Sequence, residues 1–267
     1  MSFEAYLSKI KPITIAGSAS GNRAATPKEV RALRGLIGSL QWPASQGCPH
    51  LSCSISMTAG QMTIATVGTL KEANKMLRFA KSNAAVTLEF PPLGKAFGLL
   101  ALSGAAWGTR HDGSSQGGML ILAVPRHAFN DQQASYAVVD WKSWKLERVS
   151  KSSLNAETQG ASTAVDNLEF IKVLEARMHQ PETNVKDYAL RLTRPSALVT
   201  DTKSMYDSLK KEAPAQSAAD KRTAIEQIAM RQVMTATGTA LRWVSSERQL
   251  ADGLTKITGR QLLADRL

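Results

Sequence analysis

The chain has 267 residues, 43% of them hydrophobic, and a formal net charge of +11 at pH 7. This content supports a buried core in one large domain or two small ones. No apolar stretch approaches the ~20 residues that span a bilayer, which excludes a transmembrane helix. The positive charge favours a polyanionic partner, with nucleic acid as the default, although a basic balance also serves solubility alone.

The N-terminal sequence lacks the apolar run of a signal peptide, so we expect an intracellular protein, cytoplasmic or nuclear, that is not secreted. The two cysteines, Cys48 and Cys53, have only His50 nearby and make a poor zinc site. We interpret them as two thiols in a reducing compartment.

Residues 1–94 are predicted to be mainly helical. After a short helix near 6–10 and a loop rich in small residues, Pro27 suits the first turn of a helix. That helix is expected to stop near Pro43, because the residue before a proline disfavours helical geometry. Two further helices are expected at about 51–61 and 69–82, and Pro91 and Pro92 mark the boundary with the next segment.

Residues 95–256 show a different pattern, in which strands come first and then alternate with helices. Strands are expected at 97–103, at 118–124, within 135–149, at 197–200 and at 240–244. Helices are expected at 153–178, 201–211 and 218–234, and from 249 onward. Three hairpin-linked strands followed by helix-separated ones predict an α/β fold, a mixed five-stranded sheet flanked by helices. Residues 257–267 are expected to form a C-terminal tail.

Three carboxylates lie at the ends of these predicted elements: Glu157, Asp201 and Asp252. Each has an ordinary structural explanation. A glutamate in the first turn of a helix is favoured by the helix dipole, an aspartate between a strand and a helix is a common N-cap, and an aspartate in a polar helix is usually solvated. Their combination at element ends is what indicates a site.

Several segments, in this order along the chain, resemble the C-terminal part of a copia-type retrotransposon polyprotein, where the end of the reverse transcriptase is followed by a ribonuclease H domain. The matching segments are LRGLIGSLQW at 33–42, ANKMLRFA at 73–80, AAW at 105–107 with SSQGG at 114–118, WKS at 141–143 with SSLNAE at 152–157, VTD at 199–201, and WV at 243–244 with LADGLTK at 250–256. The likeness covers about residues 30–256. It divides the chain into a helical reverse transcriptase thumb or connection remnant (1–94) and a ribonuclease H-like domain (95–256).

The resemblance implies an enzyme that cuts the RNA strand of an RNA–DNA hybrid with two Mg²⁺ ions ~3.5–4 Å apart. Matched residue by residue, Glu157, Asp201 and Asp252 are the catalytic metal ligands. The fourth carboxylate, which ends the first strand and bridges both ions, has no counterpart. Alignment on Trp107 places Gly104 there, and a shift of one residue places Ser103 there. We therefore expect an inactive or weak ribonuclease H.

Aromatic and basic residues alternate at Trp141, Lys142, Lys145 and Arg148, which is typical of nucleic-acid-binding surfaces and equally of a solvated strand edge. Lys221 and Arg222 mark a helix start that suits phosphate.

No paired aspartates of a polymerase palm occur before residue 94, so no polymerase activity is expected. The partners implied are an RNA–DNA hybrid and the remainder of the polyprotein. The alternatives are a non-catalytic nucleic-acid-binding module and a transposon relic without function.

Overall fold

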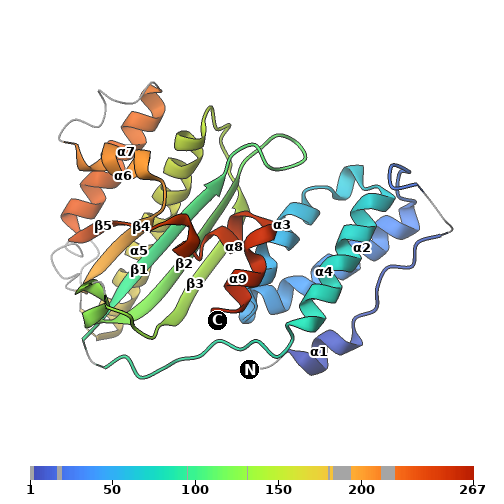
Figure 1. The fold of residues 1–267 in the computed structure, drawn as a ribbon, viewed down its shortest axis with the longest axis horizontal. Helices are drawn as coiled ribbons and strands as arrows, with labels where there is room; N and C mark the ends of the chain where they lie inside the picture. Colours follow the sequence, from blue (N-terminus) through green and yellow to red (C-terminus); the bar gives the residue numbers. More distant parts are fainter. Residues whose placement is uncertain are drawn as a thin grey trace.

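The computed structural model of this chain describes residues 3–16, 20–94, 96–130, 132–179, 181–182, 194–211 and 220–267. A group of helices built from the N-terminal third lies beside a sheet with its own helices, and an extended segment around residues 84–94 connects the two parts (Figure 1). Within the described ranges, no helix has the length and apolar character needed to cross a membrane.

The N-terminal part is helical, as predicted. It contains α1 (Glu4–Lys9), α2 (Pro27–Gln46), α3 (Ser52–Ala59) and α4 (Val67–Ser82), with short 3₁₀ turns at Pro49–Leu51 and Met62–Ile64. Thr26 begins α2 with a capping box, in which its side chain accepts from the Glu29 N–H and Glu29 accepts from the Thr26 N–H. The apolar faces of these helices enclose a core that includes Leu33, Leu40 and Leu70.

The expected end of α2 near Pro43 is wrong, because the helix continues to Gln46 with Pro43 inside it. A proline within a helix leaves the carbonyl four residues earlier, here that of Ser39, without its usual N–H donor. The Tyr6 hydroxyl donates to this carbonyl at 3.0 Å and replaces the missing bond. A contact from α1 therefore supports the continuation of α2.

The sheet has the strand order β3-β2-β1-β4-β5. Its strands are β1 (Phe97–Ala106), β2 (Gln116–Pro125), β3 (Ala137–Lys145), β4 (Ser196–Thr200) and β5 (Thr239–Trp243). β1, β2 and β3 pair antiparallel, whereas β4 pairs parallel with both β1 and β5. This mixed five-stranded sheet with flanking helices, preceded by a helical segment, confirms the predicted α/β fold class.

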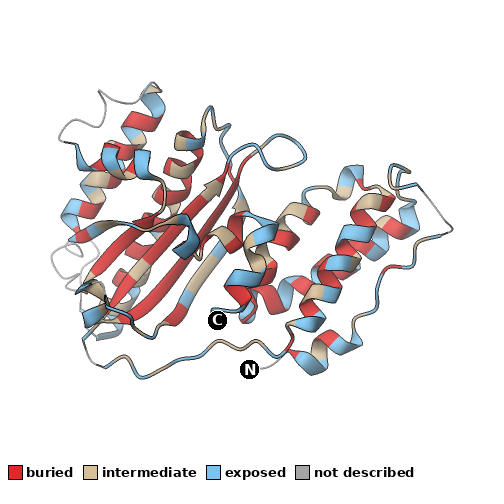
Figure 2. Ribbon diagram, viewed as in Figure 1, coloured by how far each residue is buried: buried red, intermediate tan, exposed pale blue. Residues whose placement is uncertain are grey.

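Helices cover the two faces of the sheet unequally. One face packs against α5 (Ser153–His179), α6 (Lys203–Lys210) and α7 (Lys221–Ala236). The other face packs against α8 (Asp252–Thr255) and α9 (Arg260–Ala264), which lie in front of the sheet in Figure 1. Buried residues run along the central strands between these layers (Figure 2). Residues 257–267, expected as a tail, contribute the buried Leu263 to this second core.

The helical part and the sheet meet through polar contacts from α2 and α3. The Trp141 indole N–H donates to the Ala44 carbonyl at 2.8 Å. Arg110 donates to the Ser56 hydroxyl at 3.2 Å, and Arg260 donates to the Ser54 hydroxyl at 3.1 Å. These bonds satisfy polar groups that the contact takes out of water, so they fix the orientation of the two parts.

Candidate functional site

Glu157 reaches the end of β1 because α5 approaches that strand closely. A Cβ atom added at Gly160 would lie 3.1 Å from the Gly104 carbonyl oxygen, so a glycine at this position lets the helix and strand approach. The backbone N–H of Ala105 and the hydroxyl of Thr202 favour the charged form of the Glu157 carboxylate and lower its pKa, against the larger opposite effect of burial. Its second oxygen, Oε2, is buried without a hydrogen-bond partner.

Asp201 directly follows β4, which lies next to β1 in the sheet. The Ser246 hydroxyl donates to Asp201 Oδ2 at 2.7 Å, and the Trp243 indole N–H donates to the Asp201 carbonyl at 2.9 Å. Both donors come from β5 or the segment after it. The end of β4 is therefore tied to its other neighbour in the sheet.

Asp252 begins α8, which lies directly on the sheet over Gly118 of β2. A Cβ atom at Gly118 would come within 2.7 Å of Thr255 Cγ2, so any larger residue would push α8 away. The segment before α8 is held by the buried Gln249, which donates to the Ser103 carbonyl at 3.1 Å. Lys256 Nζ lies 2.9 Å from Asp252 Oδ2 and forms an ion pair with it.

The three carboxylates influence one another electrostatically. Burial, followed by the negative charge of Asp201, raises the pKa of Glu157 to about 8, and Asp252 adds to this shift. Burial also raises the pKa of Asp252, against the opposing effect of Lys256. Burial disfavours the charged form of Lys256, but its hydrogen bond to Asp252 and the charges of the carboxylates outweigh this and raise its pKa. The fold thus gathers the three acids predicted from the sequence around one end of the sheet.

Residue 104, rather than residue 103, faces Asp252. A Cβ atom added at Gly104 would lie 3.9 Å from Asp252 Oδ1 and 3.7 Å from Thr255 Cγ2, which is ordinary van der Waals contact. Ser103 is on the opposite face of β1, because neighbouring residues of a strand alternate, and its hydroxyl is buried without a hydrogen-bond partner. A side chain longer than that of glycine therefore has room at position 104.

The carboxylates do not form a metal-binding group as they stand. In the part of the chain that the structure describes, no set of three or more His, Cys, Asp or Glu side chains is arranged to hold a metal ion. Lys256 already supplies a positive charge to Asp252. The nearest other acid after β1, Asp112, is exposed and forms an ion pair with Lys145 at 2.5 Å. These residues therefore fit a pair of divalent cations poorly.

The predicted nucleic-acid-binding residues are engaged to different degrees. Lys145 pairs with Asp112, and Arg148 pairs with Glu226 on α7. The Trp141 indole N–H is used in the contact with α2, and Lys142 Nζ lies 5.1 Å from the centre of the Trp144 ring. Lys221 and Arg222 are exposed at the start of α7.

A second aromatic and basic cluster, which sequence reasoning missed, lies beside Asp201. Lys203 Nζ is 4.8 Å from the Tyr206 ring centre and 5.8 Å from that of Trp243, and Lys210 Nζ is 4.6 Å from the Tyr206 ring centre. Lys203 also pairs with Asp207 at 2.9 Å. The alternation of Lys203, Tyr206 and Lys210 is visible in the sequence, but only the parallel pairing of β4 and β5 brings Trp243 to them.

Comparison with known proteins gives distant structural neighbours only. No protein-family model matches the chain, and no curated protein matches it. The native protease–reverse transcriptase of prototype foamy virus has 14% identity over 66% of this chain, with a TM-score of 0.37. This chain spans 21% of that protein.

Two isolated domains show similar values. The N-terminal RNase H domain of a Mycobacterium tuberculosis protein, solved as a fusion with maltose-binding protein, has 13% identity over 62% of this chain and 97% of its own chain, with a TM-score of 0.35. The RNase H domain of the foamy virus has 16% identity over 62% and 93%, with a TM-score of 0.32. These scores are too low to carry an argument about this chain, whose fold class rests on its own strand order and flanking helices.

Proposed function

We propose that this chain is the ribonuclease H-like part of a copia-type retroelement polyprotein, and that it binds RNA–DNA hybrids with little or no cleavage. The observation that supports the proposal is Gly104 near the end of β1, where an added Cβ atom would lie 3.9 Å from Asp252 Oδ1. Asp252 and Asp201 also influence the pKa of Glu157, so a fourth carboxylate at position 104 would join a group of acids that already interact.

The expected loss of cleavage follows from charge. Two divalent cations need enough negative ligands to offset their repulsion, and hard cations take carboxylate oxygens. Without a bridging carboxylate, and with Lys256 paired to Asp252, the site has too little negative charge for two ions. The loss of such a ligand reduces the rate by about 10³-fold or more, roughly 4 kcal/mol. The two-ion Mg²⁺ site therefore stays a prediction.

The expected retention of binding rests on the surface around the carboxylates. Lys203, Tyr206 and Trp243 combine cations with rings beside Asp201, and Lys221 and Arg222 are exposed on α7. Cationic side chains bind phosphates regardless of the base sequence, and aromatic rings stack on unpaired or terminal bases. A net charge of +11 favours the same partner.

Fluorescence anisotropy with a labelled RNA–DNA hybrid tests this proposal, in EDTA and over a series of salt concentrations. We expect salt-dependent binding of the native chain, and a several-fold weaker affinity with a slope reduced by about 1 for Lys203→Ala. Trp243→Ala is expected to weaken binding with an unchanged slope. Lys28→Ala on α2, an exposed cation far from the site, is the matched control. Absence of binding at low salt, or equal losses for Lys203→Ala and Lys28→Ala, contradicts the proposal.

A second candidate is a module that binds nucleic acid and has no latent nuclease centre. The Lys256–Asp252 ion pair favours it, because it stabilises the cluster without metal. The two candidates differ in one result: restoring a carboxylate at position 104 restores cleavage only if the rest of a nuclease centre is retained.

A further inference from the structure

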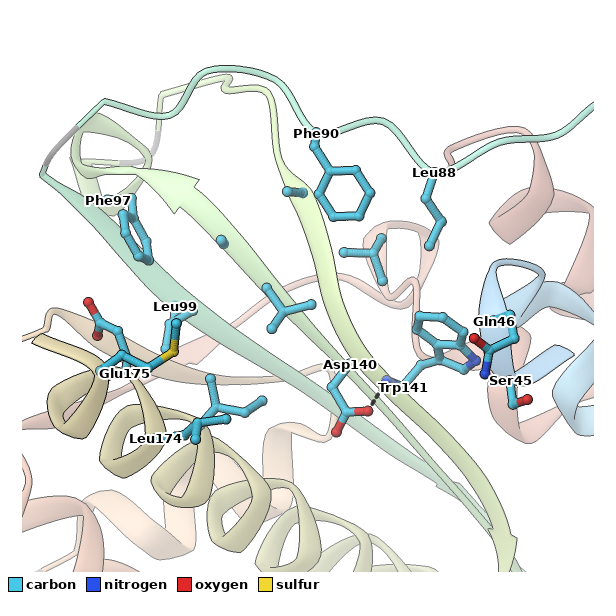
Figure 3. A pocket seen from close by; sticks show the side chains of 16 residues that line it. Ser45, Gln46, Leu88, Phe90, Phe97, Leu99, Asp140, Trp141, Leu174 and Glu175 are labelled. Carbon is cyan, nitrogen blue, oxygen red and sulfur yellow. Dashed lines mark hydrogen bonds between the residues drawn. The ribbon is translucent and has the colours of Figure 1, made fainter. Parts of the chain in front are cut away.

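A cleft in the described structure lies away from the carboxylates, between the edge of the sheet and α5. It has a volume of about 860 Å³. Figure 3 shows its walls: β1 and β3 on one side, α5 on another, the connecting segment with Leu88 and Phe90 across the top, and the end of α2 with Gln46 beside Trp141. This volume lies within the range of about 300–1,000 Å³ that is typical of ligand pockets.

Large apolar side chains around this cleft are exposed to solvent. The exposed fractions are 71% for Phe90, 42% for Val139, 50% for Leu174 and 76% for Met178. These residues come from three separate elements and line the same cleft, in which Phe90 and Leu174 lie on different walls (Figure 3). An occupant that covered them would gain about 25 cal/mol for each Å² of apolar surface removed from water.

The charge of the cleft is opposite to that of the chain. Although the chain carries +11, none of the described residues that line this space is Lys, Arg or His. Among these described residues, the ionisable groups are the carboxylates of Asp140 and Glu175. Glu175 accepts from Arg194 Nε at 3.0 Å, so its charge is already compensated.

Asp140 is therefore the acidic side chain of the cleft that is available to a ligand. It is half-buried, and its Oδ1 accepts from the backbone N–H of the next residue, Trp141, at 2.8 Å. It forms no ion pair with a residue that the structure describes. Burial raises the pKa of its carboxyl, with this backbone bond and the charge of the nearby Lys142 acting in the opposite direction. A positive group placed beside Asp140 would find a carboxylate in a mainly apolar surrounding, where opposite charges attract more strongly than in water.

The wall beside Asp140 is preformed. The Trp141 indole N–H is bonded to the Ala44 carbonyl at 2.8 Å, which fixes this ring between the sheet and α2. β3 pairs with β2 on both sides of an irregularity at Val139, so Asp140 and Val138 are each held opposite a β2 residue. Little conformational entropy is therefore lost when the space is filled.

We propose that this cleft binds an elongated apolar ligand of low molecular weight that carries one cationic group, with the cation beside Asp140 and the apolar body between Phe90, Leu174 and Met178. The paired Glu175 and the lack of cations among the described lining residues disfavour an anionic head group at either end. The site is separate from the carboxylates at the end of β1 and does not depend on the function proposed for them.

Isothermal titration calorimetry with three probes of one chain length tests the proposal at pH 7: dodecylamine, dodecanol and dodecanoate, each below the concentration at which it aggregates. The amine is expected to bind at least about tenfold more tightly than the alcohol, and the carboxylate most weakly. The overall charge of the protein favours the reverse order for the two ions, so non-specific attraction cannot produce this result.

Three variants locate the site. Asp140→Asn is expected to bring the affinities for amine and alcohol within about twofold of each other, whereas Asp166→Asn, an exposed acid on α5 outside the cleft, leaves the preference intact. Leu174→Asp is expected to weaken binding of the alcohol. The proposal is overturned if no probe binds, if amine and alcohol bind equally to the native chain, or if Asp140→Asn keeps the preference for the amine.

Discussion

Residue 104 lies where the first strand of the sheet meets the helix that carries Asp252. A Cβ atom added there would be at van der Waals distance from Thr255 and Asp252 of α8, and the backbone N–H of the next residue, Ala105, favours the charged form of Glu157. A glycine at this position therefore leaves room for a side chain beside Asp252. On the function proposed above, the chain would keep three acids of a nuclease site while it lacks the fourth.

His50 supplies a test at the same scale. It is fully buried beside Phe79, and neither ring nitrogen has a hydrogen-bond partner in the described structure. Burial, followed by the charge of Arg260, lowers its pKa from 6.5 to about 4. Between these values the unfolded chain binds more protons than the folded chain, so stability falls as the pH drops from about 6.5 towards 4.

Over this pH interval we expect the native chain to lose on the order of 3 kcal/mol of unfolding free energy. The His50→Leu variant, which lacks the imidazole, should not show this loss. Urea unfolding of both proteins at pH 7 and pH 4.5 measures the difference. His127→Leu, at an exposed histidine, serves as the control. An acid-induced loss of the same size in native and His50→Leu proteins contradicts the assignment.

At the scale of elements, the continuation of α2 through Pro43 depends on α1. The Ser39 carbonyl has no backbone donor because residue 43 is a proline, and the Tyr6 hydroxyl takes its place. The Tyr6 ring also packs edge-on against Trp42, with ring centres 4.9 Å apart. The two helices therefore share one hydrogen bond and one aromatic contact at this point.

A double-mutant cycle isolates the hydrogen bond. Tyr6→Phe keeps the ring and removes the hydroxyl, so it should cost about 0.5–1.5 kcal/mol of unfolding free energy in the native chain. In a Pro43→Ala background the alanine N–H can bond to Ser39, and the same substitution should cost close to nothing. Chemical denaturation of the native chain, the two single variants and the double variant gives the coupling energy between the two positions. If Tyr6→Phe costs the same unfolding free energy in both backgrounds, the Tyr6 hydroxyl does not replace the missing backbone bond to Ser39.

Much of the element order could be predicted from the sequence, because the apolar periodicity of each segment is strong. The prediction failed at Pro43, where a distant tyrosine decides the outcome and no local signal exists. The gathering of Glu157, Asp201 and Asp252 could be anticipated only through the resemblance, since these residues lie on α5, after β4 and on α8. The cluster of Lys203, Tyr206 and Trp243 was missed because it depends on which strands are neighbours.

At the scale of the whole molecule, a helical part with its own core is joined by polar contacts to a sheet that has a core on each face. Charged groups are distributed unevenly over these parts. The acids and the cluster around Trp243 lie at one end of the sheet, whereas the apolar cleft with Asp140 lies between the sheet edge, α5 and the helical part. A polyanion and an apolar cation would thus bind at different places. Binding of one does not require the other.

If one missing carboxylate has silenced an otherwise retained nuclease site, restoring that carboxylate should restore cleavage. Cleavage of a labelled RNA–DNA hybrid, with Mg²⁺ or Mn²⁺, should be compared between the native chain and Gly104→Asp, with Gly104→Asn as the isosteric control. We expect cleavage by Gly104→Asp alone, increased about 10³-fold or more over the other two proteins. This expectation fails if the native chain cleaves robustly, or if a folded, hybrid-binding Gly104→Asp protein remains inactive.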